Sequence, residues 1–166
     1  NIVDLLYAPL SSTEVTISIS LAAVTRSFMI AIVSIITFYI IIDIQIKYFF
    51  LLFLFTFLTS FILGNIGIIS GLWAEKFDHQ ATITNFVIVP LSFLSGTFYS
   101  IERLPDFLKK ISEVNPFFYM IDGFRFCFIG QSDGSIKVGI IYLLILSILS
   151  WLAAYILFKR GYKIKT

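Results

Sequence analysis

The chain has 166 residues, of which 58% are hydrophobic and 13% charged, and its mean hydropathy is +0.96. Soluble domains carry charges at about 25% of positions, so this composition excludes an ordinary soluble protein and indicates an all-α integral membrane protein. The net charge of +2 is small and dispersed, which argues against a nucleic-acid partner. Cys127 is the only cysteine, so neither a disulfide framework nor a cysteine-based metal site is expected.

The first expected helix runs from Ser12 to Ile42. Ser11 stands three residues before Glu14, which is the spacing of a capping box at a helix start. At ~1.5 Å per residue this helix measures ~45 Å, more than the bilayer needs, so residues 17–42 are taken as the first span. We expect Arg26 near the lipid headgroups on the Glu14 side, because a charge at the bilayer centre is costly.

A short polar break, residues 43–47, precedes the second expected span, residues 48–72, which should therefore return antiparallel beside the first. Small residues recur along this span at helical spacing and would let another helix approach closely. They are Ser60, Gly64, Gly67 and Gly71. Helix packing and a substrate role are both open for this stripe, and the neighbouring Asn65 is a candidate for a hydrogen bond between helices.

The third expected span, residues 82–99, follows a polar break over residues 74–81. His79, the only histidine, lies in that break and is expected to be solvated, because no second metal ligand stands at a suitable spacing. Pro90 removes a helical hydrogen bond and should kink the third span. The kink is either structural or shapes a path through the membrane.

Two short helices are expected over residues 104–129, before the fourth span, residues 138–158. The apolar residues of the first recur at i, i+3, i+4 and i+7, which predicts an amphipathic helix at the membrane interface. These residues are Leu104, Phe107, Leu108 and Ile111.

The second short helix has clear end signals. Asn115 can cap it, Pro116 suits its first position, and Gly130 can take the left-handed conformation that ends it. Its ~20 Å length cannot cross the ~30 Å hydrocarbon core, so the helix should dip into the membrane or lie at its surface. Asp122 and Arg125 stand three residues apart on it and can pair, either as an anchor or as a substrate contact.

The end of the chain is basic, with Lys159, Arg160, Lys163 and Lys165 within eight residues. Positive residues favour the cytoplasmic side, so the C-terminus is expected in the cytoplasm and residues 100–136 outside. No Gly-rich phosphate loop, HExxH or GxSxG motif occurs, so no catalytic, cofactor-binding or metal-binding residues are expected. The spans also lack the regularly placed charges of proton-coupled carriers, so the energy for any transport should come from a partner.

A longer pattern extends from Pro90 to Gly130: P-x-x-F-x-S-G-x-F-Y, then Leu-Pro, then Asn-Pro and a Gly-hydrophobic-Arg helix that ends in glycine. The matching positions are Pro90, Phe93, Ser95, Gly96, Phe98, Tyr99, Leu104, Pro105, Asn115, Pro116, Gly123, Phe124, Arg125 and Gly130. This pattern resembles the closing half of ABC-2 type transporter permeases, most of all the YadH-like branch that exports drugs or polysaccharides. The opening LLYAPLSSTEV is similar to the family's cytoplasmic segment between spans two and three, with Pro9, Leu10 and Glu14 in order.

The resemblance implies an export permease in the bacterial inner membrane, with a partner ATP-binding-cassette ATPase, a second permease copy as homodimer partner, and membrane lipid around it. It also implies six spans, so residues 1–166 would form one domain from the C-terminal part of such a permease, in agreement with the absence of a starting methionine. The rival functions from the sequence alone are a membrane-embedded scaffold protein and an ion-coupled carrier.

By the same resemblance, the cytoplasmic segment Val3–Ser12 would dock on the ATPase, and Glu75–Gln80 would contribute less directly. The expected contact residues are Leu5, Leu6, Tyr7, Pro9 and Leu10. The alternative for residues 1–12 is an ordinary polar loop before the first helix. The two short helices would close the outward end of the path, which makes a gate helix of the one that carries Asn115, Pro116, Asp122, Arg125 and Gly130.

Overall fold

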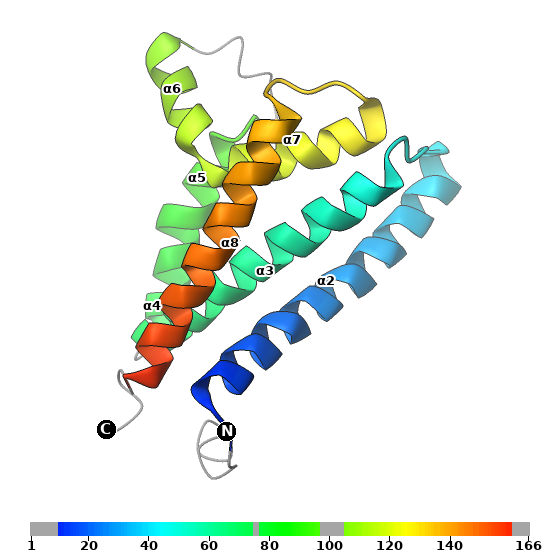
Figure 1. The fold of residues 1–166 in the computed structure, drawn as a ribbon. Coiled ribbons are helices and arrows are strands. Elements are labelled where there is room, and N and C mark those ends of the chain that lie inside the picture. Colours follow the sequence, from blue (N-terminus) through cyan, green and yellow to red (C-terminus); the bar gives the residue numbers. More distant parts are fainter. Residues whose placement is uncertain (1–9, 75–76, 97–104, 161–166) are drawn as a thin grey trace.

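The computed structural model describes residues 10–74, 77–96 and 105–160, and every regular element in these ranges is a helix (Figure 1). Three helices are long and apolar enough to cross a membrane: α2 Ser12–Ile42, α3 Phe49–Trp73 and α8 Ile136–Lys159. They match the first, second and fourth expected spans. Of the expected ATPase contacts, only Leu10 lies within the described residues, and it is half exposed.

The predicted capping box at the start of α2 is confirmed. The Ser11 hydroxyl accepts a hydrogen bond from the Glu14 backbone N–H at 3.3 Å, and the Glu14 carboxylate accepts one from the Ser11 N–H at 2.7 Å. The helix ends at Asp43, whose φ of 50° is left-handed. The predicted break after Ile42 is therefore correct.

Helices α2 and α3 run antiparallel, as predicted (Figure 1). Ser20 donates a hydrogen bond to the Asn65 Oδ1 at 2.8 Å, and both side chains are fully buried. This bond confirms the prediction that Asn65 links two helices.

The small-residue stripe on α3 packs only in part. A Cβ at Gly64 would lie 2.9 Å from the Ala23 Cβ of α2, so this glycine is needed for the close approach of the two helices. Apart from the chain neighbours and the surrounding backbone of α3 itself, no atom of the described residues lies within 4 Å of the equivalent point at Gly67 or Gly71. Helix packing is thus observed at the middle of the stripe and not at its end.

The third expected span begins earlier than predicted. It is a helical run of α4 Phe77–Ile83, the π-helical segment η1 Thr84–Ile88 and α5 Val89–Phe93. This run is not among the three helices of membrane length, and residues 97–99 lie outside the described residues.

The prediction that His79 lies in a solvated loop is wrong. His79 lies within α4 and is half buried, with its ring centroid 5.7 Å from that of Trp73. Residues 77–80, which belong to the predicted polar break, already form the first turn of α4.

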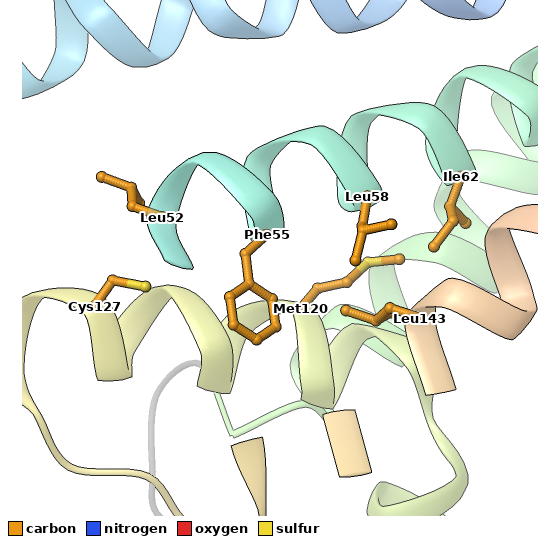
Figure 2. Close-up of a cluster of buried hydrophobic side chains, with 7 residues drawn as sticks. All are labelled: Leu52, Phe55, Leu58, Ile62, Met120, Cys127 and Leu143. Atoms are coloured by element: carbon orange, nitrogen blue, oxygen red, sulfur yellow. The ribbon is translucent and has the colours of Figure 1, made fainter. Parts of the chain in front are cut away.

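A cluster of buried apolar side chains joins α3 to α8 and to the shorter helix α7 Pro116–Ile129 (Figure 2). It consists of Leu52, Phe55, Leu58 and Ile62 from α3, Met120 and Cys127 from α7, and Leu143 from α8. Helix α3 thus lies at the centre of the fold, and α7 is part of the core despite its short length.

Candidate functional site

Two short helices, α6 Asp106–Val114 and α7 Pro116–Ile129, lie at the end of the bundle where α8 begins (Figure 1). The bounds of α7 are those predicted from its end signals. The amphipathic helix α6 also forms, although the predicted first residue, Leu104, lies outside the described residues.

Asn115 makes two hydrogen bonds at the start of α7. Its Oδ1 accepts from the Phe117 N–H at 3.0 Å, so the predicted cap is confirmed. Its Nδ2 donates to the Leu91 carbonyl in α5 at 2.6 Å. Because the Asn115 side chain is only 3% exposed, both groups need these partners. Asn115 therefore caps α7 and also ties it to α5, which the sequence did not predict.

Two further side chains hold the junction between α6 and α7. The Ser112 hydroxyl donates to the Leu94 carbonyl just after α5, at 2.7 Å. The Tyr142 hydroxyl of α8 donates to the Val114 carbonyl, also at 2.7 Å. The start of α7 is thus fixed to both α5 and α8.

The other end of α7 is tied to the turn between α2 and α3. Gly130 ends the helix with a φ of 80°, which confirms the predicted left-handed position. The backbone N–H groups of Lys47 and Tyr48 donate to the Cys127 carbonyl at 2.9 and 3.2 Å, and the Lys47 ammonium donates to the Ile129 carbonyl. A cation at a helix C-terminus also interacts favourably with the helix dipole.

An ion pair lies in the middle of α7, as predicted. Arg125 donates to the Asp122 carboxylate at 2.7 Å, and a second carboxylate, that of Asp133, lies 3.0 Å from the same guanidinium. Asp122 also accepts from the Ser132 hydroxyl at 2.5 Å and from the Asp133 and Gly134 N–H groups at 2.9 and 3.2 Å. With a side chain only 3% exposed, Asp122 organises the turn that leads into α8.

These surroundings also affect ionisation. Burial lowers the pKa of Arg125, whereas its hydrogen bond to Asp122 and the nearby Asp133 charge raise it, and the net direction is upward. Burial raises the pKa of the Cys127 thiol to about 11. At neutral pH Arg125 is therefore charged and the Cys127 thiol is protonated.

The expected gate residues lie along one helix but do not meet at one point. Asn115 and Pro116 mark its first end and Gly130 its second, while Asp122 and Arg125 face the turn before α8. Pro90 is exposed and lies two residues after the end of the π-helical segment. Such segments are a known cause of helix bends, but the predicted kink itself stays a prediction.

A polar cavity of about 300 Å³ opens beside α7, between α6 and the start of α8. Its lining combines charged groups with aromatic rings: Lys109, Glu113, Phe118, Tyr119, Asp133, Gly134, Ser135 and Val138. No group of three or more His, Cys, Asp or Glu side chains in the described part of the chain could hold a metal ion.

Comparisons with known proteins agree with the sequence pattern. The chain is 35% identical over 104 residues to the inner membrane transport permease YadH of Escherichia coli strain K12, which covers 63% of this chain and 41% of that protein. It is 24% identical over 103 residues to nodulation protein J of Sinorhizobium fredii strain NBRC 101917 / NGR234, covering 62% of this chain and 39% of that protein. The chain thus spans about two fifths of the length of these relatives. No solved structure was found to match it.

With three apolar helices of membrane length and an inner-membrane relative, the chain is a multi-pass protein of the bacterial inner membrane. Residues 1–129, well over half of the sequence, match the family described as ABC-2 type transporter. This chain belongs to the ABC-2 type transporter family.

Proposed function

We propose that this chain is part of the permease subunit of an ATP-binding-cassette exporter. It would form the translocation path together with a second copy, and ATP hydrolysis in a separate subunit would drive it. Family membership supports the permease role, and the name of YadH, a transport permease, agrees with it. The helical run over residues 77–93, with the residues that follow, would supply a fourth crossing.

The observation that carries a gate role for α7 is its attachment at both ends to different parts of the bundle. Asn115 ties its start to α5, and Lys47 and Tyr48 tie its end to the turn between α2 and α3. A helix held in this way lies across one end of the membrane helices without crossing the membrane itself. In the proposed function this is the external end, and α7 closes the path there.

Coupling to an ATPase is tested at the N-terminal segment. We expect an ATP-binding-cassette protein to copurify with the permease, and its ATPase rate to change several-fold when Leu5, Leu6 or Pro9 is replaced by aspartate. The control is Lys137→Asp, which changes an exposed residue near the start of α8 and should leave the ATPase rate unaltered. Absence of both copurification and a rate change would favour a scaffold protein, whereas transport that follows an ion gradient alone would favour a carrier.

The gate role is tested at Asn115. Serine at this position keeps an N-cap oxygen for the Phe117 N–H but cannot reach the Leu91 carbonyl, so α7 stays capped and loses its tie to α5. We expect Asn115→Ser to raise the leak of a small polar dye from proteoliposomes in the absence of ATP. Lys137→Gln serves as the control.

If the folded Asn115→Ser variant leaks no more than the control, α7 does not close the path. That result would leave the ATPase partnership untouched, since the two experiments change different parts of the sequence and measure different activities.

A further inference from the structure

Helices α3 and α8 finish, and α4 begins, at the end of the bundle away from α7 (Figure 1). An apolar groove lies at this end. Its volume is about 360 Å³, within the range of roughly 300–1,000 Å³ that is usual for ligand sites. Five of its six lining residues are apolar, and the lining consists of Ile66, Ile69, Ser70, Trp73, Ile83 and Leu157. The one polar side chain, Ser70, already donates to the Gly67 carbonyl at 3.0 Å. The groove therefore suits a hydrocarbon chain.

Helix α3 supplies one continuous side of this groove. Four of the lining residues stand at i, i+3, i+4 and i+7 on α3, so they form a stripe along the helix axis. Trp73, 48% exposed, is the last residue of this stripe and of α3. Tryptophan is enriched where a membrane meets water, so the groove runs from the apolar interior to the membrane surface.

A cation lies where the groove reaches the surface. Arg160 follows Leu157 by three residues, which puts both on the same side of α8, and it is exposed. Arg160 is not paired with a carboxylate within residues 10–74, 77–96 and 105–160. An anion at this position would therefore meet uncompensated positive charge.

We propose that this groove binds an anionic phospholipid. One acyl chain lies against the α3 stripe, and the headgroup phosphate contacts Arg160. A zwitterionic lipid fills the groove equally well but adds no net charge to match this cation. Each basic residue near an anionic membrane surface strengthens binding about fivefold, so the site selects lipids by charge.

The charge component is tested with the purified permease by native mass spectrometry, after addition of phosphatidylglycerol or phosphatidylcholine with matched acyl chains. The wild-type protein should retain more phosphatidylglycerol than phosphatidylcholine. Arg160→Gln should lower retention of phosphatidylglycerol about fivefold and leave phosphatidylcholine unchanged. Lys137→Gln, which removes a cation at the other end of α8, should behave like the wild type.

The apolar component is tested by filling the groove. Ile69→Trp adds bulk to its lining and should lower retention of both lipids. Ile148→Trp is the matched control, because Ile148 is 57% exposed on α8 and does not line the groove. Elution of each variant in size-exclusion chromatography establishes that it is folded before its lipids are compared.

Three results would overturn the proposal: equal retention of the two lipids by the wild type, no effect of Arg160→Gln, or no effect of Ile69→Trp. Displacement of phosphatidylglycerol by millimolar inorganic phosphate would also overturn it, since the acyl chain would then contribute nothing. A Leu157→Cys variant that crosslinks to a second copy in membranes would show that the partner permease covers the groove instead. None of these measurements requires ATPase activity, so failure here is distinct from failure of the transport function.

Discussion

Replacement of Gly123 by alanine is expected to lower the stability of the folded protein more than any other single-methyl change in α7. A Cβ at this position would lie only 2.5 Å from the Cδ1 and Cζ atoms of Phe55 on α3. The Phe55 ring is fully buried in the core cluster, so it has no free space to move into (Figure 2). Overpacking of this kind costs roughly 1–3 kcal/mol, and here it must push α7 away from α3.

The measurement is the midpoint of thermal unfolding in detergent, followed by fluorescence-detected chromatography. Gly67→Ala is a matched control, because this glycine is also helical and, apart from its chain neighbours and the surrounding backbone of α3, no described atom lies within 4 Å of the added methyl group. Alanine favours the helix over glycine, so this variant should be as stable as the wild type or slightly more so. Similar losses in both variants would mean that the contact between α3 and α7 tolerates displacement.

Replacement of Asp122 by alanine is expected to disrupt the turn that leads into α8. The change removes the acceptor for four donors at once: the Arg125 guanidinium, the Ser132 hydroxyl and two backbone N–H groups. Loss of one partner of a buried ion pair costs about 3–5 kcal/mol, because the remaining charge stays without compensation. Arg125 is 25% exposed and still has Asp133 beside it, so the lower part of this range is expected.

Unfolding by heat again measures the effect, and Asp133→Ala is the comparison. This change removes the second carboxylate near Arg125, on a side chain that is 18% exposed, and it leaves the backbone N–H that donates to Asp122. Its cost should be smaller than that of Asp122→Ala, because Arg125 keeps its hydrogen bond to Asp122. If Asp133→Ala destabilised the protein as much as Asp122→Ala, the turn would depend on Asp133 instead.

Features that depend on neighbouring residues were predictable from the sequence. The capping box at Ser11 and the ends of α7 at Asn115 and Gly130 follow from local backbone and side-chain preferences, and all three are confirmed. The Asp122 and Arg125 pair was also predictable, because residues three apart face each other on a helix. The long apolar helices followed from hydropathy.

Features that join distant parts of the chain were missed. The hydrogen bond from Lys47 to the Ile129 carbonyl joins residues 82 positions apart in the sequence. No local sequence pattern near either residue predicts it. The second hydrogen bond of Asn115, to the Leu91 carbonyl, was not predicted. The capping role was already a sufficient reason for an asparagine at this position, so nothing pointed to a further partner. For the bond of Lys47, the only available signal was a single lysine in the short break between two spans. The last carbonyl groups of a helix have no partner within the helix, so they can accept a hydrogen bond from such a side chain.

The third expected span shows a different limit. Its polar start was interpreted as a loop, but residues 77–83 are helical. The π-helical segment at 84–88 was not predicted either. It ends two residues before Pro90. Proline has no N–H for a regular helical hydrogen bond, so the π-helical segment lies next to a position where the helical hydrogen-bond pattern must change in any case.

The bonds that hold α6 and α7 have an evolutionary consequence. Each pairs a specific side chain with a main-chain oxygen that any residue can offer: Asn115 with Leu91, Ser112 with Leu94, Tyr142 with Val114, and Lys47 with Ile129. The donor positions should therefore accept few substitutions, whereas the acceptor positions can change freely among apolar residues. Correlated substitutions between the two positions of a pair would not arise, so comparison of homologous sequences alone would not reveal these contacts.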